Sequence, residues 1–166
     1  MNKTDVQTLL AYDRWANERI FEMLSTMDEA ALRQDQSTSH ESIFGTLVHL
    51  VGAMEVWHAR WESRSGVGLP APSEIDSLAA LRERWIAIAA ACDAFLEALP
   101  ENRLEQPVAI QSLSQHEHHH TFAQMFQHLV NHSSYHRGQI ITMLRQADAS
   151  VAGTDLIVFL REQQQA

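Results

Sequence analysis

Apolar residues recur every three or four positions along most of this chain, which is the period of amphipathic helices. The first run predicts a helix over residues 5–25, opened by a capping box of Thr4 and Gln7. The second run predicts a helix over residues 43–63. The third predicts a helix over residues 76–99 that the following proline ends.

A fourth long helix is expected over residues 122–146. It starts after a second capping box, formed by Thr121 and Gln124. Towards the end of the chain, Gly153 precedes a short apolar segment, residues 156–160. This segment predicts a terminal helix that packs across the others.

The connections between these helices are long. Residues 65–73 contain two glycines and two prolines, which predict a loop. Residues 101–120 lack a helical period, and the weak alternation over residues 108–113 is consistent with a short strand or hairpin. No internal repeat or second domain is visible, so residues 1–166 are expected to form one domain. The pattern predicts an all-α four-helix bundle with a short extra C-terminal helix and room for a crossover connection.

Composition narrows the possible environments and partners. The formal net charge of -9 and the absence of a basic run argue against nucleic-acid binding. The N-terminus lacks the pattern of a signal peptide, and no uncharged apolar stretch approaches membrane-spanning length. The single cysteine, Cys92, cannot form an internal disulfide. We therefore expect a cytoplasmic protein with no membrane partner.

Two histidines occupy positions on the fourth helix where core residues should stand. The apolar stripe passes through Leu129 and resumes at Ile140, and between them lie His132 and His136. Residues four apart lie on one face of a helix, so both imidazoles can reach a single metal ion at roughly 2.0–2.1 Å. The pair is a candidate half of a metal site, although buried histidines also occur as hydrogen-bonded core residues.

A candidate third ligand is His49, on the second predicted helix. Its helical neighbours are Gly45, Gly52 and Ala53. These small residues predict a hollow that lets another helix approach or leaves volume for an ion. Three neutral histidines would leave one coordination position for water or substrate, as in catalytic zinc sites. The ion could then activate water or stabilise the thiolate of a small molecule, and the ligand type suits Zn²⁺, Ni²⁺ or Cu²⁺.

Several other polar residues have competing interpretations. We expect His128 to be structural or to line a pocket, and the histidine-rich run over residues 116–120 to be solvated without fixed geometry. Asp13 could orient a ligand imidazole or bond locally. Arg137 is expected to form a salt bridge rather than meet an anionic substrate, and Gly138 to permit close helix packing.

Four segments carry a resemblance to a known family: LLAYDRWANERI, FGTLVHLVGAMEVW, TFAQMFQHLVNHSSYHRGQI and TDLIVFL. Together they span most of the chain, and NHSSYHRGQ is the most specific of them. On these residues the sequence resembles the DinB (damage-inducible) family, which is described together with YfiT-like metal-dependent hydrolases.

The resemblance implies a four-helix bundle, usually a homodimer, with one divalent metal ion, Zn²⁺ or Ni²⁺. Matched residue by residue, the implied ligands are His49, His132 and His136. The implied activity is hydrolysis, or S-transfer and isomerisation with a low-molecular-weight thiol such as bacillithiol or mycothiol. The alternative is a non-catalytic, stress-associated homodimer whose ion stiffens the bundle. An open coordination position inside a pocket would favour the enzyme.

Overall fold

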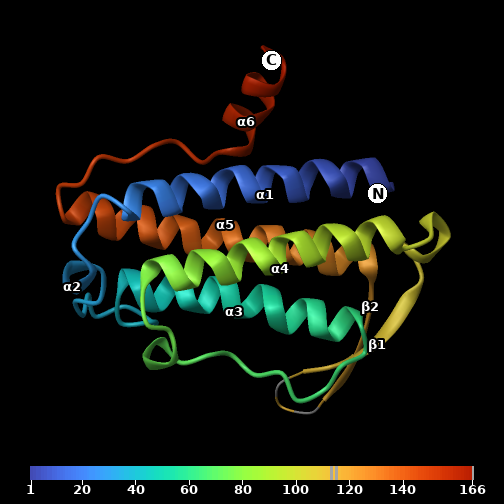
Figure 1. The fold of residues 1–166 in the computed structure, drawn as a ribbon. Coiled ribbons are helices and arrows are strands. Elements are labelled where there is room, and N and C mark those ends of the chain that lie inside the picture. Colours follow the sequence, from blue (N-terminus) through green and yellow to red (C-terminus); the bar gives the residue numbers. More distant parts are fainter. Residues whose placement is uncertain (113, 115, 166) are drawn as a thin grey trace.

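Four long helices lie alongside one another and form the body of the protein (Figure 1). In this computed structural model, residues 1–112, 114 and 116–165 are described. Helices α1 and α3 both pack against α4 and α5, so each helix has two neighbours around a shared core. The predicted all-α four-helix bundle is confirmed. Its members are α1 (Lys3–Leu24), α3 (Ile43–Trp61), α4 (Leu78–Ala98) and α5 (Phe122–Gln146).

One connection crosses the length of the bundle. Helices α3 and α4 run in the same direction, so residues 62–77 return along the outside of the bundle, as Figure 1 shows. This segment is irregular except for the 3₁₀ turn η1 (Pro72–Glu74), in line with its glycines and prolines. The earlier connection contains α2 (Glu29–Leu32), a single turn that the sequence pattern did not predict. Asp28 caps it by accepting a hydrogen bond from Ala30 N.

The helix starts are set by side-chain caps. Asn2 Oδ1 accepts from Asp5 N at 2.9 Å, and Asp5 Oδ2 accepts from Asn2 N at 2.9 Å. This box begins α1 earlier than expected, so the prediction that Thr4 caps the helix is wrong. The predicted second box is confirmed, because Thr121 Oγ1 accepts from Gln124 N at 3.2 Å and Gln124 Oε1 accepts from Thr121 N at 3.1 Å.

A two-stranded hairpin joins α4 to α5, after the short turn η2 (Glu101–Arg103). Strand β1 (Pro107–Gln111) pairs with the antiparallel strand β2 (Glu117–Thr121). The expected strand over residues 108–113 is found, although Leu113 lies outside the described residues. The prediction that the histidine-rich run has no fixed geometry is wrong, because pairing with β1 holds most of it extended.

The predicted C-terminal helix α6 (Leu156–Gln163) is found; it packs against α1 and projects away from the bundle (Figure 1). The ring of Phe159 lies 6.0 Å from that of Tyr12 and 5.6 Å from that of Trp15. Trp15 Nε1 also donates to Glu162 Oε2 at 2.9 Å. In the described part of the chain, no helix combines the length and apolar character needed to cross a membrane.

Candidate metal centre

Helix α5 presents His132 and His136 to the interior of the bundle. The helix is held in this orientation by its apolar stripe, since Leu129 and Ile140 are completely buried on either side of the pair. The two imidazole centroids lie 4.4 Å apart, and His136 is 4% exposed. The spacing of four residues therefore places both rings at one point on the helix, as the sequence predicts.

Helix α3 brings His49 to the same point. Its ring centroid lies 4.6 Å from that of His136 and 5.3 Å from that of His132. The structure thus brings together all three histidines that the sequence singles out. Their roles as the ligands of one ion remain a prediction.

The two glycines near His49 make room for loop segments, not for another helix or an ion. A Cβ at Gly45 would lie 2.1 Å from the carbonyl oxygen of His40, and a Cβ at Gly52 would lie 2.4 Å from Pro70 Cδ. Both glycines therefore admit loop segments. The prediction of a hollow for α5 or for an ion is wrong, because connecting backbone and a proline ring fill these positions.

A fourth histidine, His40, completes the cluster. Its ring stacks on that of His49 with centroids 4.0 Å apart, and its centroid lies 5.2 Å from that of His136. The nitrogen ligand atoms of His40, His49 and His136 lie within 4.8 Å of one another, so these residues could hold a metal ion. Sequence reasoning missed His40 because it lies in the loop before α3, where no period tells which way a side chain points.

His132 provides an independent test of whether the cluster suits a metal. Its Nε2 is buried, and within the described part of the chain it has no hydrogen-bond partner. A buried nitrogen without a partner costs about 1–3 kcal/mol. A metal ion among these rings would supply the missing partner of His132 Nε2. The histidines therefore fit a divalent metal ion that binds imidazole nitrogen.

The cluster keeps its imidazoles neutral, which is the form that binds metal. Burial, and to a smaller extent repulsion from the neighbouring imidazoles, lowers the pKa of His49 to about 4. Burial, together with repulsion from His136, lowers the pKa of His132 to about 4. Burial also lowers the pKa of His40 and of His136. All four rings are therefore uncharged near neutral pH.

Gln139 orients the ring of His136. Its Oε1 lies 2.8 Å from His136 Nδ1 and accepts a hydrogen bond from it, which leaves Nε2 free to ligate. Of the two roles considered for Asp13, the structure shows local hydrogen bonding rather than a bond to a ligand imidazole. The Asp13 carboxylate accepts hydrogen bonds from Arg137 and Asn17.

A buried ion pair supports the helix beside the cluster. Arg137 is 1% exposed, and its Nη1 donates to Asp13 Oδ1 at 2.5 Å and to Asn17 Oδ1 at 2.9 Å. The expected salt bridge is thus confirmed, and it ties α5 to α1 next to His136. The prediction that Gly138 permits close helix packing is wrong, because a Cβ at this position would meet no atom within 4 Å.

His128 lies beside the cluster, since its ring stacks on that of His132 with centroids 5.7 Å apart. His128 is exposed, and its ring centroid lies 4.8 Å from that of Trp57. Residues 116–120 are exposed on the hairpin, with His119 Nε2 3.8 Å from Glu117 Oε1.

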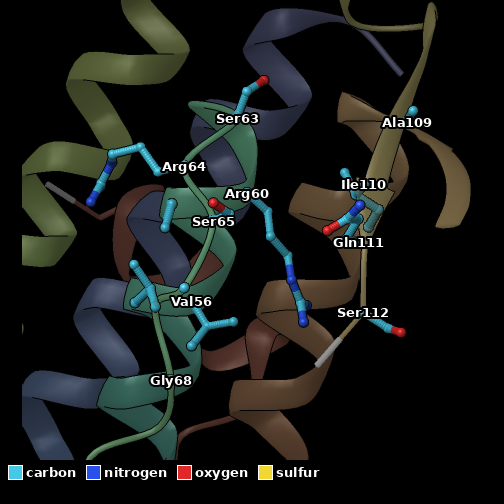
Figure 2. A pocket seen from close by; sticks show the side chains of 13 residues that line it. Val56, Arg60, Ser63, Arg64, Ser65, Gly68, Ala109, Ile110, Gln111 and Ser112 are labelled. Carbon is cyan, nitrogen blue, oxygen red and sulfur yellow. The ribbon is translucent and has the colours of Figure 1, made fainter. Parts of the chain in front are cut away.

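Two surface cavities lie near α3 and α5. One, of about 510 Å³, is lined by residues 36–39 and by Tyr135 and Gln139. Tyr135 and Gln139 both contact His136, so this cavity borders the cluster. The other, of about 520 Å³, lies between the end of α3 and β1, where Arg60 extends into it (Figure 2). None of the four clustered histidines lines either cavity.

Comparison with known proteins gives consistent matches. A sequence model described as DinB family matches residues 1–166. Protein DinB of Bacillus subtilis (strain 168) is 28% identical over 159 residues, which cover 92% of this chain and 91% of the relative. The crystal structure of a DinB-like protein from Bacillus cereus ATCC 10987 matches with a TM-score of 0.66 at 19% identity. That match covers 87% of this chain and 94% of the other, and it shows a shared fold.

Proposed function

Since the chain belongs to the DinB family, we propose that it is a metal-dependent enzyme whose ion is held by His49, His132 and His136. The reaction is hydrolysis or transfer to the sulfur of a low-molecular-weight thiol. The observation that carries the proposal is the buried Nε2 of His132, which has no partner among the described residues and lies within a cluster of neutral imidazoles.

The ligand set suits a divalent ion of intermediate softness. Three imidazoles without a carboxylate favour Zn²⁺ or Ni²⁺ over Mg²⁺ and Ca²⁺, which prefer oxygen. When bound, the ion supplies Lewis acidity and lowers the pKa of a coordinated water or thiol. The protein provides uncharged ligands, and Gln139 fixes the tautomer of His136 through its Nδ1.

The cavity of about 510 Å³ beside His136 supports a catalytic role. Two residues of its lining, Tyr135 and Gln139, contact His136, so a small molecule bound there would lie beside the proposed centre, which an ion that only stiffens the bundle does not need. Its described lining is made of hydroxyl and amide side chains, the ring of Tyr135 and one methionine, with no charged residue. The substrate is therefore expected to be a small molecule that hydrogen-bonds through uncharged polar groups.

Metal content tests the ligand assignment. We expect tag-free protein to bind one equivalent of Zn²⁺ or Ni²⁺ by elemental analysis, and the His132→Ala variant to lose it. His118→Ala is the matched control, because His118 is exposed on β2. Unchanged metal content in His132→Ala would refute the assigned ligands.

Activity is tested by a separate screen. Metal-loaded protein is incubated with low-molecular-weight thiols and electrophilic acceptors, and in parallel with ester and amide substrates, and product formation is followed by mass spectrometry. Turnover that disappears in His132→Ala would support the enzyme. Metal binding without turnover across the screen would favour the alternative, a non-catalytic metal-binding protein.

The homodimer implied by the family resemblance belongs to the same proposal. On α6, Leu156 is 36% exposed and Ile157 is 53% exposed, so this helix offers apolar surface for a second copy. Light scattering on the purified protein is expected to give twice the mass of 18.8 kDa. A single-chain mass at micromolar concentration would contradict this part.

A further inference from the structure

The loop before α3 brings a fourth imidazole into the cluster, and neither the helical spacing nor the matched motif accounts for it. The His40 ligand atom lies within 4.8 Å of those of His49 and His136. Its ring is stacked on that of His49, with an interplanar angle of 17°. A solvated loop histidine has no reason to lie among three other imidazoles.

We propose that His40 is a fourth, exchangeable ligand that occupies the open coordination position of the metal centre in the resting protein. This inference rests on the proposed function, because it assumes that His49, His132 and His136 hold the ion. It adds a means of regulation, since the substrate must displace His40 before it can reach the metal.

The backbone around His40 is built to hold it in this place. A Cβ at residue 45 would lie 2.1 Å from the His40 carbonyl oxygen, so only glycine admits the loop this close to the first turn of α3. Ser42 caps that turn, because its Oγ accepts from Gly45 N at 3.0 Å. Glu41, which lies between His40 and Ser42, has a φ of 63°, in the left-handed region. The positions of His40 and of the helix start are therefore coupled.

The loop is also attached in a way that allows exchange. His40 lies outside any helix, whereas His49, His132 and His136 are fixed on α3 and α5. The loop closes on itself, through hydrogen bonds from Gln36 N to Glu41 O at 2.6 Å and from Glu41 N to Thr38 O at 3.0 Å. Because His40 lies on this loop, its side chain could leave the metal without movement of α3 or α5.

The exchange would take place next to the cavity that borders the cluster. Residues 36–39 form one wall of that cavity, and Tyr135 and Gln139 line it from α5. A molecule bound there would contact residues 36–39, in the same loop as His40.

Cobalt replacement tests the proposal without depending on activity. Metal-free protein is titrated with Co²⁺, and the visible absorption spectrum and the dissociation constant are measured for wild type, His40→Ala and the control His118→Ala. We expect His40→Ala still to bind one equivalent, but with a dissociation constant raised at least about tenfold. Its spectrum should shift, because water replaces a nitrogen ligand.

Azide then tests whether the fourth position is open. We expect azide to change the Co²⁺ spectrum of His40→Ala at a concentration at least about tenfold lower than it requires in wild type, because in wild type it must displace an imidazole. Equal azide affinity, together with equal spectra in the absence of azide, would overturn the proposal.

A second variant tests the placement of the ring without removing it. Gly45→Ala should push the His40 carbonyl away and give the same spectral shift as His40→Ala. Gly52→Ala is the matched control on α3, because its added Cβ would meet Pro70 rather than the His40 loop. An unshifted Gly45→Ala spectrum in a folded, cobalt-bound protein would also contradict the proposal.

The outcomes separate this inference from the proposed function. If wild type binds no cobalt, or if His132→Ala binds it unchanged, the proposed three-histidine centre fails. If His132→Ala loses cobalt while His40→Ala matches wild type in affinity, spectrum and azide response, only the role of His40 fails.

Discussion

Four imidazoles packed against one another make protonation of any one of them unfavourable. In the unfolded chain a histidine takes up a proton near pH 6.5, whereas in the folded protein burial lowers the pKa of His49 and of His132 to about 4. Between these values the unfolded state binds more protons, so the free energy of unfolding increases with pH in this window.

We therefore predict that metal-free protein loses stability as the pH falls from about 6.5 to about 4. The measurement is the urea midpoint at pH 7 and at pH 5. The His49→Gln/His132→Gln double variant should show a smaller difference between the two midpoints. An equal difference in both proteins would mean that these rings do not cause the pH dependence.

A second prediction at this scale concerns Gln139. Its removal in Gln139→Ala frees His136 Nδ1 and should weaken metal binding about 10- to 100-fold, the usual effect of losing a partner of a ligating histidine. Gln139→Glu should restore or strengthen binding, since a carboxylate is a better acceptor. Gln127→Ala on the exposed face of α5 is the control, and competition with a chelator gives the affinities.

The sequence predicts single residues well where helical phase applies and poorly elsewhere. The positions of His132 and His136 follow from periodicity, because a helix fixes which side chains share a face. His49 was selected correctly but for a wrong reason, since Gly45 and Gly52 beside it admit loop segments. His40 could not be placed, since its direction depends on a left-handed residue and on the space left by Gly45. Gly138 was misread because its surroundings come from the tertiary structure.

The element that presents the α5 histidines is anchored by Arg137 and Asp13 rather than by apolar packing alone. Removing one partner of a buried ion pair leaves the other charge uncompensated, at a cost of about 3–5 kcal/mol. We predict that Arg137→Met destabilises the protein by about this amount in urea denaturation. Asp13→Leu/Arg137→Met should be less destabilised than Arg137→Met, because it leaves no unpaired charge.

The surface pair of Arg84 and Glu55 is the comparison. Arg84 Nη2 donates to Glu55 Oε2 at 2.7 Å, but its side chain is 39% exposed. Arg84→Met should therefore cost about 0–1 kcal/mol. Similar losses for Arg137→Met and Arg84→Met would show that burial of the inner pair has little effect.

At the level of elements, the long helices could be predicted and the short ones could not. The bounds of α5 agree with the prediction, because the long amphipathic stripe and the capping box at Thr121 both place the start of the helix at residue 122. A single turn such as α2 has too few residues to show a period. Strand β2 was missed because its stability comes from pairing with β1, not from its own histidine-rich sequence.

For the whole molecule, a shared ion would join α3 to α5 and stabilise only the folded state. At free metal 100-fold above the dissociation constant, the gain is about 2.7 kcal/mol. We predict a higher thermal midpoint for Zn²⁺-loaded protein than for metal-free protein, measured by circular dichroism. His132→Ala should show little change on adding Zn²⁺, and an equal rise in both would place the stabilising ion elsewhere.

The order of the ligands along the chain has a consequence for biosynthesis. His49 lies on α3, whereas His132 and His136 follow α4 and the hairpin. A ribosome must therefore complete α5 before the two sides of the centre can meet. If these three residues hold one ion, the nascent chain carries no finished chelate until α5 has been made, and the rate of metal binding could not exceed the rate of docking α5 onto α3.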